Sequence, residues 1–201
     1  PNSGMITFDG QDLLTVPAHK RPHAGLVRSF QITSVFPELT VLDNICLVLQ
    51  SMRGHAHSII RMASSDYSEQ NEAKEILSRV GLNDKAESLT GNLAHGQKRQ
   101  VEIAMALATK PKLLLLDEPM AGMGTEESIQ IMDLLNVLRK SVTMLLVEHD
   151  MDVVFSLADK VSVMVYGRVV VSDKPENIRN NQDVQEAYLG GNKLKTKATI
   201  C

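Results

Sequence analysis

The chain has 201 residues, which is enough for one substantial domain with its own hydrophobic core. Because 21 Lys and Arg stand against 24 Asp and Glu, the net charge of −3 is too balanced to suggest a surface for nucleic acid or anionic lipid. Because Cys46 and Cys201 are far apart in the sequence, we expect a chain without disulfides in a reducing compartment. The apolar runs are much shorter than the roughly 20 residues of a membrane span, so we expect no membrane helix.

The N-terminal half predicts a β ribbon followed by helices. Residues 4–13 place strand-forming residues on both sides of Asp9-Gly10, a hairpin turn signal. From about residue 42 to residue 110, helix-forming residues predominate, which predicts a helical subdomain inserted between strands. Within it, apolar residues recur at helical spacing from Ala73 to Val80, and Gly81 follows as a helix terminator.

A second helix is predicted after Gly96, with Val101, Ala104 and Ala108 on one stripe. The period then changes at Leu113–Leu116, a continuous apolar run that predicts a buried strand ending in acidic residues.

Strands and helices alternate through the rest of the chain. We expect a helix over about 125–140, with Ile129, Met132, Leu135 and Leu138 facing inward, and then a strand over 143–148. A helix, a strand over 161–165, a turn at Gly167-Arg168, a strand over 169–171 and a helical C-terminus follow. This alternation predicts an α/β fold with a mostly parallel sheet and ligand chemistry at the carboxyl ends of the strands.

Acidic and imidazole side chains follow two of these strands. Asp117 could hold Mg²⁺, and Glu118 could orient or deprotonate a water molecule. His149, directly after the next strand, could donate a hydrogen bond to a phosphate. The alternative is that the two acids end a solvated strand and that the histidine only caps one.

Two further segments could contact a nucleotide. Gly96 lies at the start of a helix, where backbone amides and the helix dipole favour an anion, although an ordinary glycine-containing helix start has the same pattern. Gln31 ends a short segment that leads into the helical region, and its amide could touch Mg²⁺ or the attacking water.

Taken together and in this order, these features resemble the ATP-binding-cassette (ABC) family from about Pro1 to Gly190. The correspondence is Gln31 with the Q-loop, residues 93–97 with the signature, Asp117 and Glu118 with the Walker B pair, residues 121–126 with the D-loop and His149 with the switch histidine.

The resemblance implies a P-loop NTPase-like ABC ATPase core that uses ATP and Mg²⁺, with Asp117 and Gln31 at the metal and Glu118 and His149 catalytic. It implies nucleotide contacts from Gln31, Asp117, Gly122 and Gly124 and, toward a second ABC ATPase subunit, from Ala94, His95, Gly96 and Gln97. It also implies transmembrane permease partners, a place on the inner face of the cell membrane and no nucleic acid.

Several runs, among them residues 117–123 and 148–151, are similar to the ATP-binding subunits of branched-chain amino acid importers. We therefore expect a cassette domain over 1–190, followed by a basic tail over 191–201 that is disordered.

The sequence departs from the family pattern at several points, including His95 in the signature, where a Gly or aromatic residue is usual, and Met105 in the helix that follows, where Arg is usual. No G-x-x-x-x-G-K-S/T motif occurs, so we expect the N-terminal part of the core, with its phosphate-binding loop, to be missing. Ala94 stands where the signature usually has Ser, which removes a hydrogen bond to phosphate of about 1.5–3 kcal/mol. Gly124 stands where the D-loop usually has Asp or Asn.

These departures leave a second interpretation open, a catalytically silent ABC module that docks or dimerises without turning over ATP. A third, a cassette ATPase that acts on ribosomes or DNA, is disfavoured by the modest net charge.

Overall fold

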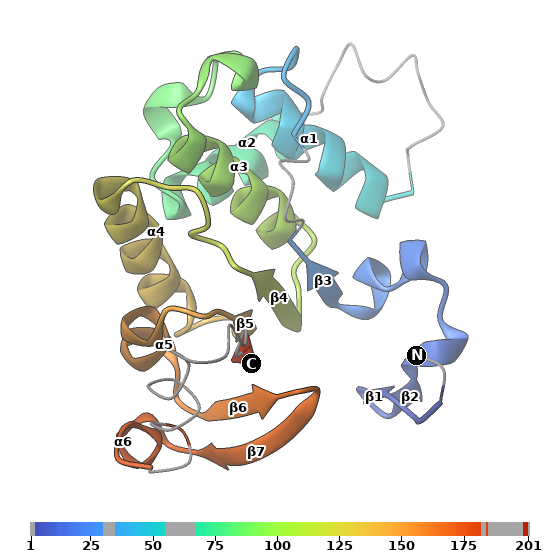
Figure 1. Cartoon of the computed structure of the whole chain (residues 1–201). Coiled ribbons are helices and arrows are strands. Elements are labelled where there is room, and N and C mark those ends of the chain that lie inside the picture. Colours follow the sequence, from blue (N-terminus) through green and yellow to red (C-terminus); the bar gives the residue numbers. More distant parts are fainter. Residues whose placement is uncertain (1–2, 30–34, 55–66, 182–183, 185–198, 201) are drawn as a thin grey trace. The chain divides into compact units, whose positions relative to one another are not determined.

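The computed structural model describes residues 3–29, 35–54, 67–181, 184 and 199–200 (Figure 1). The chain divides into two compact units. The first comprises Pro1–Arg28 and Ser34–Leu114, and the second comprises Ser29–Thr33 and Leu115–Cys201. The cassette domain expected over 1–190 stays a prediction.

The first unit begins with the predicted β ribbon. Strands β1 (Thr7–Phe8) and β2 (Gln11–Asp12) pair antiparallel. Asp9 and Gly10 both have positive φ, 50° and 77°, as a two-residue type I′ hairpin turn requires. Strand β3 (Leu26–Arg28) follows, and the carbonyl of Gly25 accepts hydrogen bonds from the N–H groups of Lys112 and Leu113 at 2.8 and 3.0 Å.

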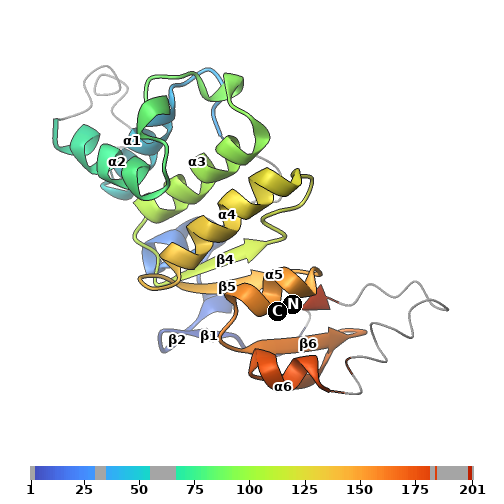
Figure 2. The same ribbon diagram turned by 90° about the vertical axis from the view of Figure 1, so that its left-hand side faces the viewer.

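The described residues of the first unit also include three α-helices: α1 (Val41–Met52), α2 (Tyr67–Arg79) and α3 (His95–Ala108). They pack against one another (Figures 1 and 2) and bury Ile45, Leu77 and Ile103. Gly81 has a φ of 75° and ends the predicted helix. The three helices lie between Val41 and Ala108, close to the range of about 42–110 expected for the helical subdomain, and the limits of that subdomain stay a prediction.

The second unit alternates strands and helices. Strand β4 (Leu113–Asp117) continues into it and is followed by α4 (Thr125–Leu138), β5 (Thr143–Val147), α5 (Met151–Leu157), β6 (Val161–Val165), β7 (Arg168–Asp173) and α6 (Pro175–Arg179). Strand β5 lies next to β4 in the sheet, and α4 makes the crossover that neighbouring parallel strands need. The predicted α/β fold with a parallel sheet is confirmed.

The last strands form a separate antiparallel sheet. Strand β6 pairs with β7 and, on its other side, with β8 (Thr199–Ile200). A small core beneath this sheet contains Val154, Val161, Val163, Ile178 and Val184. Of the tail expected over 191–201, Thr199 and Ile200 are described and form β8, and the rest lies outside the described residues.

Three local predictions were wrong. Ile129 is 52% exposed, because the buried stripe of α4 is Ile131, Leu134, Leu135 and Leu138, and a residue two positions before Ile131 points to the opposite face. The turn between β6 and β7 is Tyr166-Gly167, since these two residues have positive φ and Arg168 already begins the strand. Helix α3 begins at His95, so Gly96 lies inside its first turn.

Among the residues that the structure describes, no helix combines the length and the apolar character needed to cross a bilayer.

Candidate functional site

Strand β4 delivers two carboxylates to the end of a buried strand. Leu114 and Leu116 are fully buried, and Asp117 ends the strand. Glu118 has a φ of 43°, a left-handed conformation that costs a non-glycine residue of order 1–3 kcal/mol and is found most often at functional sites. Its N–H donates to the carbonyl of Val147 at 2.9 Å, so the ends of β4 and β5 are held together.

His149 meets Glu118 at this edge. It follows β5 directly, and its Nδ1 lies 3.3 Å from Oε1 of Glu118. Both side chains remain partly open to solvent. The structure therefore brings together the predicted base and the predicted switch histidine, although neither catalytic role is tested by this proximity.

Glu148 is a third acid at the same edge, and it was not among the predicted site residues. Its side chain is only 4% exposed, its Oε2 accepts a hydrogen bond from the N–H of His149 at 3.2 Å, and Oε2 lies 3.9 Å from Nδ1 of His149. Its Oε1 is buried without a hydrogen-bond partner. Burial raises the pKa of Glu148, and the backbone amide of His149 opposes that rise. The sequence signal that could have identified Glu148 is its place directly between an aliphatic strand and a histidine.

The loop after Glu118 is built from tight turns. The N–H of Ala121 donates to the carbonyl of Glu118 at 3.1 Å, and Gly122 has a φ of 77°, a conformation that favours glycine. Gly124 is the N-cap of α4, and its N–H donates to Oε2 of Glu127 at 3.4 Å. Gly122 and Gly124 thus lie on the segment that joins Glu118 to α4, and their predicted nucleotide contacts stay a prediction.

The signature-like residues lie at the start of α3, in the first unit. Ala94 is the N-cap of α3. Oε1 of Gln97 accepts a hydrogen bond from the N–H of Ala94 at 3.2 Å, which is one half of a capping box. The other half is missing, because the alanine side chain has no oxygen to accept a backbone N–H. His95 and Gly96 form the first helical positions. Their predicted role toward a second subunit stays a prediction.

The donor set fits a magnesium ion in part. No cluster of three or more His, Cys, Asp or Glu suited to a metal occurs within residues 3–29, 35–54, 67–181, 184 and 199–200. Mg²⁺ bound with a nucleotide characteristically takes one or two carboxylates and completes its shell with phosphate and water oxygens, and Asp117 can supply such a carboxylate. Gln31, the other predicted ligand, lies outside the described residues.

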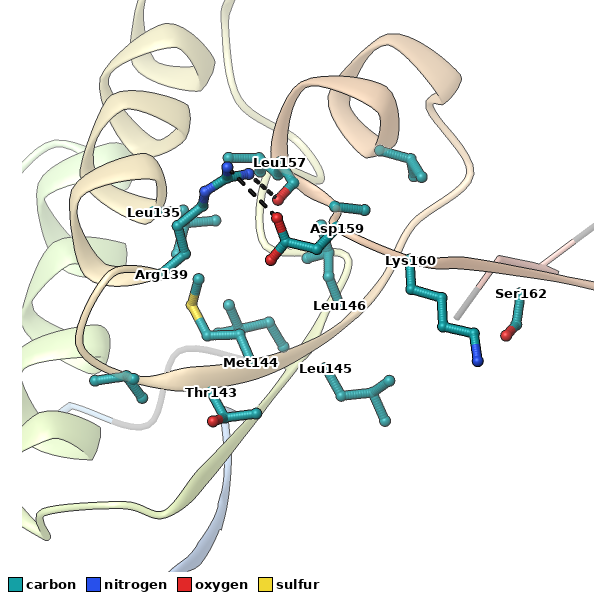
Figure 3. A pocket seen from close by; sticks show the side chains of 14 residues that line it. Leu135, Arg139, Thr143, Met144, Leu145, Leu146, Leu157, Asp159, Lys160 and Ser162 are labelled. Carbon is teal, nitrogen blue, oxygen red and sulfur yellow. Dashed lines mark hydrogen bonds and ion pairs between the residues drawn. The ribbon is translucent and has the colours of Figure 1, made fainter. Parts of the chain in front are cut away.

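A cavity of about 430 Å³ lies elsewhere in the second unit (Figure 3). It is lined mainly by aliphatic side chains of β5, α4 and α5 and by the start of β6, and it contains none of the predicted site residues. Figure 3 shows Arg139 at its rim, where the guanidinium donates to the carbonyl of Leu157 at 2.6 Å and lies 3.6 Å from Asp159. The cavity therefore separates β5 from β6, which belong to different sheets.

Comparison with known proteins gives a consistent family. The family model described as ABC transporter matches residues 1–121. The chain is 36% identical to the high-affinity branched-chain amino acid transport ATP-binding protein BraF of Pseudomonas aeruginosa, over 94% of this chain and 77% of that protein. It is also 36% identical to the protein of the same description, LivG, of Escherichia coli K12, with the same two coverages.

A solved structure supports the same fold. An ATP-binding cassette of an ABC transporter, in its ADP conformation, superposes with a TM-score of 0.74 and 27% identity, over 94% of this chain and 78% of that chain. The order of the acids, the histidine and the helices described above agrees with this likeness. The chain belongs to the ABC transporter family, among its ATP-binding subunits.

Proposed function

We propose that this chain takes part in ATP-driven import of branched-chain amino acids or a related small solute, as an ATPase subunit of an ABC transporter. The observation that carries the proposal is the pairing of Glu118 with His149 at the ends of neighbouring strands, in a chain that is 36% identical to two branched-chain amino acid transport proteins. The proposed cargo rests on those two relatives alone, because none of the contacts described above involves a transported molecule.

Each site residue has a distinct proposed role. Asp117 would hold Mg²⁺ together with Gln31. When bound, ATP would supply the phosphoanhydride bond, and Mg²⁺ would neutralise the negative charge of the phosphates. Glu118 would orient a water molecule and accept its proton. His149, held at 3.3 Å from Glu118, would donate a hydrogen bond to a phosphate oxygen.

Partners follow from the same proposal. The start of α3, with Ala94, His95, Gly96 and Gln97, and the loop with Gly122 and Gly124 would contact a nucleotide held by a second ABC ATPase subunit. The helical insert around residues 45–68 would dock transmembrane permease subunits, and the chain would then lie on the inner face of the membrane. We propose no nucleic-acid partner, in keeping with the net charge of −3.

A silent docking module is the second candidate, and one observation favours it. Ala94, at the N-cap of α3, has no side-chain hydrogen bond, so it cannot give a phosphate the hydroxyl contact that the usual serine gives. In that case the chain would associate with a partner subunit and contribute no turnover of its own.

The test supplies the phosphate-binding loop from a second protein. The chain is mixed with an ABC ATPase subunit that carries its own loop, and ATP-dependent association and ATP turnover are both measured. We expect association, and we expect Glu118→Gln to slow the turnover that the chain adds by about 10²–10⁴-fold while association persists.

The matched control is Glu176→Gln, which removes an exposed acid of α6 and should leave both readouts unchanged. Association without added turnover in the unmodified chain would favour the silent module, and the absence of association would reject both candidates. Uptake of labelled leucine by membrane vesicles containing the permease, compared with uptake of urea, then tests the cargo.

A further inference from the structure

Two segments of the first unit that are far apart in the sequence, residues 36–40 and 88–92, lie side by side. The N–H of Gly91 donates to the carbonyl of Pro37 at 2.9 Å, and the N–H of Thr90 donates to another carbonyl of the first segment at 3.0 Å. A Cβ at Gly91 would lie only 3.0 Å from the carbonyl oxygen of Pro37, so the glycine permits this close approach of the two backbones.

The side chain of Asn44 joins both segments from the first turn of α1, where it is fully buried. Its Oδ1 accepts a hydrogen bond from the N–H of Phe36 at 2.8 Å. Its Nδ2 donates to the carbonyls of Phe36 and Thr40 at 3.1 and 2.9 Å. The same Nδ2 donates to Oγ1 of Thr90, across the two segments, at 3.0 Å. One buried amide group is therefore bonded to both segments.

This position needs a donor and an acceptor in one side chain. An apolar side chain such as leucine would fill the space of Asn44, but it would leave the N–H of Phe36 without its acceptor and the buried hydroxyl of Thr90 without this donor. Polar groups left unpaired in this way cost free energy, and a network that is fully bonded specifies one arrangement of the chain. The amide of Asn44 thus favours the arrangement in which the two segments stay together.

The turn that contains Thr90 leads directly into α3. The N–H of Leu93 donates to the carbonyl of Thr90 at 3.2 Å, and Leu93 is buried. Ala94, the next residue, is the N-cap of α3. Nζ of Lys98, one turn into the helix, donates to a carbonyl of the same turn at 2.9 Å. The backbone that Asn44 holds is therefore the backbone from which α3 starts.

We propose that Asn44 is a positioning residue. It holds the turn before α3 against residues 36–40, and it thereby fixes the place from which residues 94–97 would meet a nucleotide on a second subunit. The proposal deepens the proposed function and rests on it for its purpose, because that contact with the nucleotide is itself proposed.

Hydrogen exchange of the full chain without nucleotide, followed by NMR, tests whether Asn44 holds the turn. The amides of Thr90 and Gly91 are the reporters, because they donate to backbone carbonyls and not to Asn44 itself. We expect Asn44→Leu to accelerate exchange at both amides by about tenfold or more, and by a clearly larger factor than at the amides of Leu77 and Ile103 in the helical core.

Two substitutions of Thr90 separate the hydrogen bond from the packing. Valine has nearly the shape of threonine but cannot accept from Nδ2 of Asn44, whereas serine keeps the hydroxyl and loses a methyl group. We expect Thr90→Val to accelerate exchange at Gly91 as Asn44→Leu does, and Thr90→Ser to keep the original rate. Ile45→Val is the matched control, because it removes a buried methyl group from the neighbouring residue of α1 and should leave exchange at Gly91 unchanged.

ATP-dependent association tests whether this position serves the proposed function. The chain is mixed with an ABC ATPase subunit that carries its own phosphate-binding loop, and the ATP concentration for half-maximal association is measured. We expect Asn44→Leu and Thr90→Val to raise this concentration about tenfold, and Thr90→Ser and Ile45→Val to leave it unchanged.

Unchanged exchange at Gly91 in a folded Asn44→Leu variant would overturn the proposal. Equal acceleration at Gly91 and Leu77 would overturn it as well, since it would mean that Asn44 only stabilises the unit as a whole. A Thr90→Ser variant that behaves like Thr90→Val would do the same. If Asn44→Leu does not fold, the two Thr90 variants decide alone.

The two hypotheses fail in different ways. If the unmodified chain shows no ATP-dependent association while exchange responds as predicted, the proposed function is rejected and the hold of Asn44 on the turn stands. If association needs no more ATP in the variants whose exchange is accelerated, the positioning role alone is rejected.

Discussion

Two buried carboxyl groups, one in each unit, are treated in opposite ways. Glu69 of α2 is met by the guanidinium of Arg53 at 3.2 Å and by the amide of Gln50 at 3.0 Å, so its charge is balanced locally. Glu148, which follows β5, has no Lys or Arg partner among the described residues; the cationic group nearest to it is the imidazole of His149, whose Nδ1 lies 3.9 Å from Oε2, and burial raises the pKa of Glu148. The helical unit uses its buried acid to join α1 and α2, whereas the second unit keeps a buried acid without a Lys or Arg partner beside Glu118 and His149, as functional sites often do.

Packing at the edge of β5 is looser than in the core of the three helices. The α1–α2–α3 core has Leu77 at 0% exposure, whereas Leu145 of β5, which lines the cavity, is 43% exposed. We expect Leu77→Ala to lower the free energy of unfolding by about 2–5 kcal/mol and Leu145→Ala by less than about 1 kcal/mol. Urea denaturation followed by circular dichroism measures both. Equal losses would show that the edge of β5 is packed as closely as the helical core.

Removing the cation of the helical unit tests the charge comparison directly. Arg53→Met leaves Glu69 with Gln50 as its partner and also removes the contact of Arg53 with Glu72 at 2.6 Å. We expect a loss of about 1–3 kcal/mol, because a buried charge loses its counterion and Arg53 itself is partly exposed. The double variant Arg53→Met with Glu69→Gln should recover part of the loss, and no recovery would mean that the Arg53 stem, not its charge, matters.

The pH dependence of the second unit should have the sign set by Glu148. Because its folded pKa is raised above the ordinary 4.5, its favourable contribution is fully present below pH 4.5 and is lost as the pH rises through the folded pKa. Replacing it by Gln removes this loss. The stability of Glu148→Gln relative to the unmodified chain should therefore increase as the pH rises from 4.5, as measured by thermal unfolding across that range. A constant difference would show that the carboxyl group titrates normally.

The helical unit should show the opposite sign, with a smaller effect. Lys110 lies 2.8 Å from Glu72 and, with Arg53, lowers the pKa of Glu72 below 4.5. The stability from this pair is present above pH 4.5 and is lost as the pH falls through the lowered pKa. Lys110→Met should cost only about 0.2–1 kcal/mol at neutral pH, because the lysine is largely exposed, and should cost progressively less in acid. A loss that grows on acidification would contradict this assignment.

Patterns with short-range causes were predictable from the sequence. The Asp9-Gly10 turn and the helix end at Gly81 depend on backbone conformations that few residues adopt, and the placement of Glu118 and His149 followed from two apolar runs that each ended in polar residues. The inward face of α4 was misjudged at Ile129, because two apolar stripes compete on that helix and only tertiary packing selects one.

Features that depend on long-range contacts could not be predicted from the sequence. The sequence places Glu148 between a strand and a histidine, but the burial of its side chain depends on packing between residues that are far apart in the sequence. Gln31, which is predicted to be a metal ligand, lies outside the described residues, so its place in the site stays a prediction.

Cys46 gives the helical unit a reporter of its own opening. It is buried in α1, and burial raises the pKa of its thiol to about 11. Since thiol reagents attack the thiolate, alkylation at neutral pH requires α1 to separate from its neighbours before the sulfur can ionise and react. The rate at which Cys46 is alkylated, followed by mass spectrometry, therefore measures how often the helical unit opens. The second unit can open at a different rate without changing this measurement.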